Sequence, residues 1–217
     1  MRISELSAAT GVSVASIKYY IREGLIPSGD RVGYNQTRYG NQHIARLKLI
    51  GALVNQGGLT IASARDVLAA VDNDDFELGD VFAVAQHASS LSPESEPAGP
   101  AVQRVLAFAR DHGWDVSDDN PGVAMVASAI EAFDAVTAAD LGEPLRSYAD
   151  AADGIAKADL SNLPENEDRA RSAETVVVGT VLGDTIIAGL RRIAQEHHSK
   201  VRLAGRDPAT SHDDDGA

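Results

Sequence analysis

Hydrophobic positions near the start of the chain repeat with a helical period in two segments separated by a glycine. The first segment spans residues 3–10, Gly11 follows it, and the second runs over 14–23. Ser13 suits the N-cap position of the second segment, because its hydroxyl can accept a hydrogen bond from a free backbone amide. Two short helices joined by a tight turn are typical of a helix-turn-helix motif. The inward positions are Ile3, Leu6 and Ala9, then Ile17, Tyr20 and Ile21.

The next segment changes from helical to extended character. Residues 28–33 are rich in turn formers, and 34–39 then read as a short extended arm, so a two-stranded hairpin, or wing, is predicted here. Helical periodicity returns over 41–56, where Gly57 and Gly58 end it, and again over 61–71.

Helical patterns dominate the rest of the chain. A helix over 77–91 is followed by a linker rich in proline, serine and glutamate over 92–100. Further helices are predicted over 101–112, 121–138, 143–158 and 167–198. We therefore predict a mainly α fold, in which an N-terminal winged helix-turn-helix domain is joined to a C-terminal helical bundle. The predicted divisions are the domain 1–71, a connecting helix and linker 72–100, a dimerisation or effector domain 101–200, and a disordered acidic tail 201–217.

Charge is distributed unevenly between these parts. The 217-residue chain has a net charge of −13. Residues 1–71 carry eight Lys or Arg against four Asp or Glu, whereas 72–217 carry eleven against twenty-eight. Because binding to a polyanion follows the local field, a basic small domain beside an acidic larger one is compatible with nucleic-acid binding.

The predicted second helix and wing carry the residues suited to DNA contact. Hydroxyl, aromatic and cationic side chains on the outer face of a helix can reach phosphates and base edges in the major groove. A basic hairpin can hold the flanking backbone. The alternative is that the tyrosines pack the core and the cations are solvated, and for Tyr20 the inward spacing favours the core. The predicted DNA-binding residues are Ser13, Ser16, Lys18, Tyr19, Arg22, Arg31, Tyr34, Asn35, Arg38 and Tyr39.

Several other functions find no support in the sequence. Cysteine is absent, which removes disulfides, thiolate metal sites and cysteine nucleophiles. No cofactor motif, metal cluster or catalytic constellation is recognisable, so we expect neither an enzyme nor a cofactor. The sequence also shows no signal peptide and no uninterrupted apolar run long enough to span a membrane. We therefore expect a cytoplasmic protein.

The ordered set of residues in the first third resembles the N-terminal domain of MerR-type transcriptional regulators. The resemblance implies a winged helix-turn-helix, a symmetric homodimer, and binding to a pseudo-palindromic promoter operator. It also implies bending and untwisting of the DNA so that RNA polymerase can engage the promoter. The residues that carry it are Ile3-Ser4-Glu5-Leu6, Gly11-Val12-Ser13, Ile17-Lys18-Tyr19-Tyr20, Glu23-Gly24-Leu25-Ile26-Pro27, Arg38-Tyr39 and Arg46-Leu47.

The chain departs from this family at several points. Lys18 stands where the family usually has arginine, which removes a bidentate donor. The wing over 35–39 (Asn-Gln-Thr-Arg-Tyr) is similar to that of a redox-sensing branch, but without cysteine the cluster-based signal of that branch cannot operate. The helix over 77–91 lacks the sustained heptads of the family's usual dimer coiled coil.

The long helix over 174–198 is the predicted substitute for that coiled coil. It is apolar nearly all round, which fits a dimer seam or the centre of a bundle, and a core helix of a single chain is the alternative. The predicted interface residues are Val176, Gly179, Thr180, Gly183, Ile187 and Leu190.

An effector site in the C-terminal region is a further hypothesis. Four aromatic residues, Phe108, Trp114, Phe133 and Tyr148, could line a pocket for a small molecule, although each could equally fill a core. The acidic average of this region favours a cationic or neutral ligand. Two other classes stay open: a helical protein that uses the winged domain to dock a protein partner, and an enzyme built in the C-terminal bundle.

Overall fold

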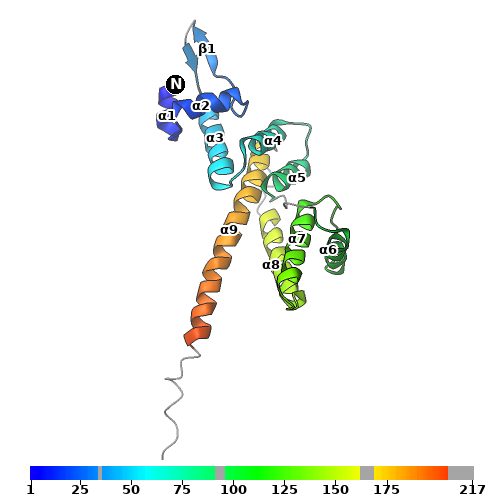
Figure 1. Cartoon of the computed structure of the whole chain (residues 1–217). Coiled ribbons are helices and arrows are strands. Elements are labelled where there is room, and N and C mark those ends of the chain that lie inside the picture. The colour runs from blue at the N-terminus through cyan, green and yellow to red at the C-terminus, as the bar shows by residue number, and fades with distance from the viewer. Residues whose placement is uncertain (34–35, 91–95, 162–168, 205–217) are drawn as a thin grey trace, which may run out of the picture.

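The computed structural model describes residues 1–33, 36–90, 96–161 and 169–204, and it has the predicted mainly α fold. A two-stranded antiparallel sheet lies at one end of the molecule, and the long helix α9 runs toward the opposite end (Figure 1). The elements are α1 (Ile3–Thr10), α2 (Val14–Arg22), β1 (Asp30–Gly33), β2 (Gln36–Arg38), α3 (Asn41–Ile50), the π-helical segment η1 (Gly51–Gln56), α4 (Ile61–Asp72), α5 (Leu78–Ser89), α6 (Gly99–Asp111), α7 (Pro121–Val136), α8 (Gly142–Ser161) and α9 (Arg169–Ala204).

Local sequence signals place the first helices where the pattern predicted them. Gly11 ends α1 with a positive φ of 72°, a conformation that costs glycine little. Ser13 caps α2, since its side chain accepts a hydrogen bond from the Ser16 amide at 3.0 Å. Thr60 caps α4 through the Ser63 amide at the same distance.

One hydrophobic core joins the N-terminal helices to two later elements. Leu6 of α1, Ile17 of α2 and Leu47 of α3 are buried together with Val81 of α5. The N-terminal part of α9 enters the same core through Ala173, Val177 and Val181. The core therefore continues across residue 71, and α9 packs with α4, α5 and η1 instead of with the C-terminal bundle in which the sequence had placed it.

Close approach between α9 and the end of η1 depends on Gly57. A Cβ atom at this position would lie 2.1 Å from Cγ1 of Val181 and 2.9 Å from the carbonyl oxygen of Leu53. The predicted helix over 41–56 changes to π-helical hydrogen bonding at Gly51, and Gly57 donates to the Ala52 carbonyl at 2.8 Å. Glycine is thus required at residue 57 by packing.

Two arginines hold the turn between α4 and α5. Arg46 of α3 donates from Nε to the Leu25 carbonyl at 2.9 Å, and its two terminal nitrogens donate to the carboxylate of Asp72. The guanidinium of Arg169, the first residue of α9, donates to the carbonyls of Val71, Asn73 and Phe76. Because both side chains are mostly buried, these charge-assisted hydrogen bonds fix α3 and α9 to one turn.

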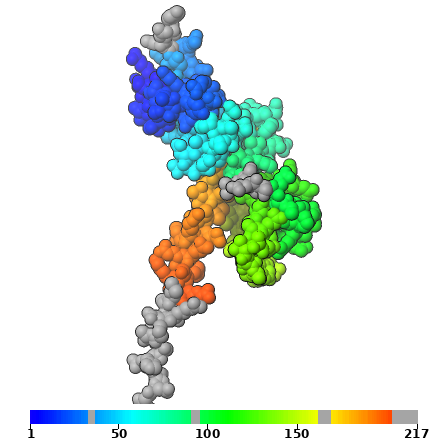
Figure 2. All heavy atoms as spheres, viewed as in Figure 1, coloured from blue at the N-terminus to red at the C-terminus, as the bar shows by residue number. Residues whose placement is uncertain are grey.

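Helices α6, α7 and the start of α8 enclose a second, smaller core. Val105 and Leu106 of α6 pack against Val123, Ala127 and Ile130 of α7. Partly buried Leu141 and Leu145 add the beginning of α8. This α6–α8 unit lies beside α9 in the lower half of the molecule (Figures 1 and 2).

Several predicted boundaries need correction. The predicted linker ends earlier than expected, because α6 starts at Gly99. Pro100 occupies the first turn of α6, where a backbone N–H would have no partner within the helix, so proline is tolerated there. Helix α9 continues to Ala204, so the predicted disordered tail begins inside a helix. The predictions for 91–95 and 205–217 fall outside the described residues.

The apolar composition of α9 is notable among the described helices. Between Arg169 and Arg202, α9 is long enough and apolar enough to cross a membrane, judged by length and composition alone. Part of that apolar character is explained by packing, since Ala173, Val177 and Val181 are buried in the N-terminal core.

The packing at Gly57 gives a stability prediction. Gly57→Ala should lower the free energy of unfolding by about 1–3 kcal/mol, because the new methyl group overlaps Val181. Chemical denaturation of the full chain measures this loss. Gly51→Ala is the matched control, since a Cβ there meets only the Asn55 side chain at 3.8 Å. In the double variant with Val181→Ala the total loss should be smaller than the sum of the single losses, and strict additivity would contradict the contact.

Candidate nucleic-acid interface

Helix α2 separates a buried face from an exposed one. Ile17 is fully buried, and Tyr20 and Ile21 are half-buried against the N-terminal core, as their spacing predicts. Lys18, Tyr19 and Arg22 lie on the exposed face. The helix therefore presents one cationic and aromatic surface to solvent.

The first turn of α2 presents two hydroxyl groups that are already engaged with each other. The Oγ atoms of Ser13 and Ser16 lie 2.8 Å apart, and Ser13 also caps the helix. The backbone amides of this first turn lie at the positive end of the helix dipole, where an anion such as a DNA phosphate is stabilised. Ser13 and Ser16, both predicted contact residues, thus also fix the start of α2.

Arg22 is held near the ring of Tyr19. Its guanidinium carbon lies 5.1 Å from the ring centroid, a cation–π distance, and its Nε lies 3.4 Å from Oε1 of Glu23. The Arg22 side chain is 71% exposed, so the Glu23 pair is a weak one that solvent screens. The guanidinium edges remain accessible for phosphate.

The predicted wing is an antiparallel hairpin of β1 and β2. Asp30 pairs with Arg38 and Arg31 with Thr37, and an irregularity follows between Arg31 and Gly33. Arg31 and Arg38 are both exposed. The hairpin rises from the same end of the molecule as α1 and α2 (Figure 1). Tyr34 and Asn35, also predicted to contact DNA, lie outside the described residues.

Tyr39 is partly buried, unlike the predicted cationic contact residues. Its ring is partly buried against the N-terminal core and meets the ring of His43 edge-on, with centroids 5.2 Å apart. Its backbone nitrogen donates to the Met1 carbonyl at 2.9 Å, and its carbonyl accepts from the Met1 nitrogen at 2.7 Å. Tyr39 therefore anchors the base of the wing, and its aromatic ring is directed inward.

Uncompensated positive charge remains on α2 and the wing. Within the described part of the chain, Lys18, Arg31 and Arg38 have no carboxylate within ion-pair distance. Arg46, by contrast, is only 12% exposed and is bound to Asp72, so it adds nothing to the surface field. Exposed cations on a helix and an adjacent hairpin form a surface suited to the phosphates of a duplex.

The four aromatic residues predicted to line one pocket do not converge. Phe108 lines a small, partly open pocket between α6, α7 and α8, whereas Tyr148 lines a wider groove between α8 and α9 with Arg191. Phe133 is half-buried on α7 and lines neither cavity.

Trp114 belongs to a row of rings beside Phe108. Its ring lies 5.3 Å from that of His112, which lies 4.5 Å from that of Phe108. The Trp114 indole nitrogen donates to Asp153 at 3.3 Å. Hydrogen bonds from Lys157 above all, and also from Trp114, hold the pKa of the Asp153 carboxyl below its ordinary value.

The predicted dimer residues on α9 fall into two groups. Val176 is buried within the single chain, which corrects its assignment to an interface between chains. Gly179 and Leu190 are exposed, and Gly183 and Ile187 are half-buried. The Thr180 hydroxyl donates to the Val176 carbonyl at 2.8 Å. Sequence reasoning missed the exposed Ile186, Ile193 and Val201, because α9 carries adjacent apolar residues and periodicity alone does not orient them.

A two-helix motif with a basic hairpin behind it defines the class of this domain as a winged helix-turn-helix. Comparison with known proteins agrees. The MerR HTH regulatory family matches residues 1–71. A mercuric resistance operon regulatory protein of Bacillus cereus is 33% identical over 81 residues, which are 37% of this chain and 61% of that protein. A ZntR homolog of Haemophilus influenzae, an HTH-type transcriptional regulator, is 40% identical over 50 residues, or 23% of this chain and 37% of that protein.

A similar solved structure extends over nearly the whole chain. It is the candidate transcriptional regulator SCO5550 from Streptomyces coelicolor A3(2), with 30% identity and a TM-score of 0.61 over 93% of this chain and 97% of that one. The chain spans only 61% and 37% of the two curated relatives. Residues 1–71 of this chain therefore form an N-terminal domain of the MerR family of helix-turn-helix regulators.

The base of the wing gives a second prediction. A Cβ at Gly29 would lie 2.4 Å from the Arg38 carbonyl oxygen and 2.7 Å from Cγ2 of Thr37. Gly29→Ala should therefore loosen the hairpin and speed amide hydrogen exchange in β1 and β2 by about fivefold or more. Gly40→Ala is the control, because its Cβ meets nothing closer than the Gln42 side chain at 3.8 Å. Equal exchange in both variants would contradict the close approach.

Proposed function

We propose that this protein is a homodimeric transcriptional regulator that binds a pseudo-palindromic promoter operator through α2 and the wing. The observation that carries the proposal is the set of exposed cations on these two elements, in a domain that belongs to a family of regulators. Among the described residues, Lys18, Arg31 and Arg38 have no carboxylate within ion-pair distance. In this proposal Lys18, Tyr19 and Arg22 enter the major groove, while Arg31 and Arg38 of the wing hold the flanking phosphates. Base contacts supply specificity and phosphate contacts supply most of the salt-dependent affinity.

The exposed half of α9 supports the homodimer. Beyond Val181 the helix leaves the N-terminal core, and Ile186, Leu190, Ile193 and Val201 are 58–67% exposed. Ile186, Leu190 and Ile193 follow one another at four and three residues, the spacing of a helix seam, and Val201 lies eight residues further on the same side. A second copy of α9 would cover this stripe, and a two-fold axis there would present two winged domains to the two half-sites.

DNA deformation is the proposed mode of regulation. Each winged domain is fixed to its own α9 through the shared core and the Arg169 hydrogen bonds, so the pairing of two α9 helices would set the separation of the two domains. An operator whose half-sites do not match this separation must bend or untwist to bind both, which changes how RNA polymerase meets the promoter. A small molecule bound in the C-terminal part would act by altering that separation.

Two cationic residues provide the direct test of DNA binding. A dimer of the double variant Lys18→Ala, Arg38→Ala loses four cationic contacts. The slope of the logarithm of operator affinity against the logarithm of salt concentration should therefore fall in magnitude by roughly 3–4. Gel shift with DNA upstream of the protein's own coding region, at several salt concentrations and with competitor DNA, measures the slope. Arg110→Ala with Lys157→Ala removes the same charge from the α6–α8 unit and should leave the slope unchanged. An unchanged slope in the first variant would exclude these contacts.

The α9 seam is tested by its oligomeric state. Leu190→Glu should shift the chain from dimer to monomer by at least about tenfold in dissociation constant, because a charge would be buried in the seam. Sedimentation equilibrium gives the constant. Val136→Glu, at a residue that is 87% exposed on α7, should leave it unchanged. A wild-type chain that is monomeric at micromolar concentration would overturn the homodimer.

A further inference from the structure

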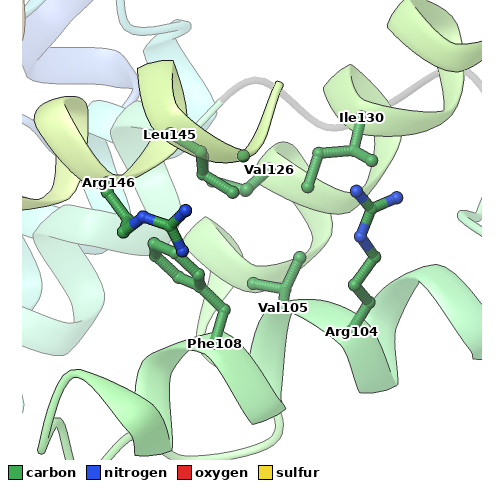
Figure 3. A pocket seen from close by; sticks show the side chains of 8 residues that line it. Arg104, Val105, Phe108, Val126, Ile130, Leu145 and Arg146 are labelled. Atoms are coloured by element: carbon green, nitrogen blue, oxygen red, sulfur yellow. The ribbon is translucent and has the colours of Figure 1, made fainter. Parts of the chain in front are cut away.

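A small, partly open pocket lies between α6, α7 and the start of α8 (Figure 3). Its volume is about 150 Å³, and its walls are mainly apolar. Val105 and Ile130 are buried at its base, while Phe108 and Leu145 are half-buried. The size matches a cavity that accepts a benzene-sized molecule, so the pocket fits one ring or a short branched chain.

Two arginines flank the apolar walls. Figure 3 shows the guanidinium groups of Arg104 and Arg146 on opposite sides of the pocket. Each guanidinium group pairs with one carboxylate. Nη1 of Arg104 lies 3.0 Å from Oδ2 of Asp134, and Nε of Arg146 lies 3.3 Å from Oε2 of Glu143. All four side chains are more than half exposed, so these pairs are weak and a ligand carboxylate can replace them.

The local charge of the pocket differs from the average charge of the region. Its lining residues include two arginines and no carboxylate, although residues 72–217 carry a large negative excess. A ligand in this space meets the guanidinium groups and not the average field. The preference for a cationic or neutral ligand that follows from the composition therefore does not apply to this pocket.

We propose that the pocket binds a small organic anion with an apolar body, of which a benzene-ring or branched-chain monocarboxylate is the type. The body fills the space among Val105, Phe108 and Leu145, and the carboxylate lies between Arg104 and Arg146. The inference deepens the sensing role in the proposed function by naming the class of ligand. Binding itself requires neither DNA nor a dimer.

The single tryptophan provides a built-in reporter of occupancy. Trp114 follows Phe108 through the ring of His112, with successive centroids 4.5 Å and 5.3 Å apart. A ligand against Phe108 changes the packing of this row of rings. Trp114 fluorescence in the full chain should therefore change on binding.

The experiment titrates the full chain with benzoate, followed by Trp114 fluorescence and by calorimetry. We expect saturable binding with a Kd of about 0.1–1 mM, as ordinary ligand efficiency allows for so small a molecule. Benzyl alcohol and acetate should bind at least about tenfold more weakly, and benzylamine should not bind. Isovalerate is titrated in parallel as the branched-chain carboxylate.

Matched variants locate the site. Val126→Trp should abolish binding by filling the pocket, whereas Met125→Trp, at the neighbouring residue that does not line it, should retain binding. Arg146→Gln and Arg104→Gln should each weaken benzoate about fivefold or more, and Arg110→Gln should not. Circular dichroism confirms that each variant is folded, and Val126 is partly exposed, so a larger side chain can be accommodated there.

The outcomes separate this inference from the proposed function. Failure of both benzoate and isovalerate to bind at millimolar concentration overturns it, as does equal binding to the Val126→Trp variant. Binding of benzylamine as strong as that of benzoate overturns the anion preference. The Lys18→Ala, Arg38→Ala variant should bind benzoate like the wild type, so a loss of DNA binding leaves this result intact.

Discussion

The structure depends on the packing of the N-terminal part of α9 into the core of the winged domain. Val181 reaches Gly57 at a distance that no side chain on residue 57 would allow, and Val177 is completely buried. At the beginning of the same helix, Arg169 binds three carbonyls of the α4–α5 turn, and Arg46 holds that turn from the side of α3. The winged domain and α9 are thus one body, and the direction of α9 follows from that of the winged domain.

This arrangement explains how a C-terminal helix could govern DNA binding. In a chain with a flexible connection, the two winged domains of a dimer would search independently for their half-sites. In the proposed homodimer, with α9 fixed to each domain, a change in how the two α9 helices pair would be transmitted to the separation of the two α2 helices. The α6–α8 unit has its own core and lies beside the exposed half of α9, where a bound molecule could affect that pairing.

Local signals in the sequence were sufficient for the winged domain. Gly11, Ser13 and the spacing of Ile17, Tyr20 and Ile21 predict α1, the turn and α2. The turn formers over 28–33 and the extended arm over 34–39 predict the hairpin, although β1 lies within the first of these segments. These features are encoded within a few residues of each other. The packing of the Tyr39 ring against His43 could not be predicted, because the alternation of a short strand does not reveal it.

Long-range features could not be predicted in the same way. The contacts of Arg169 with residues 71–76 and of Val181 with Gly57 join segments about a hundred residues apart, and periodicity carries no information about such pairs. The pocket at Phe108 also depends on the angles between α6, α7 and α8, and its two arginines looked like ordinary surface charges in the sequence. Aromatic residues alone were a poor guide, since three of the four predicted ones lie outside this pocket.

The central claim is that two copies of this chain bind one operator symmetrically. The most direct measurement is the stoichiometry of the complex with DNA from upstream of the protein's own coding region, by sedimentation velocity, together with a footprint of both strands. We expect two chains per duplex and two protected half-sites related by a two-fold axis. One chain per duplex, or no protection on any promoter fragment, would contradict it.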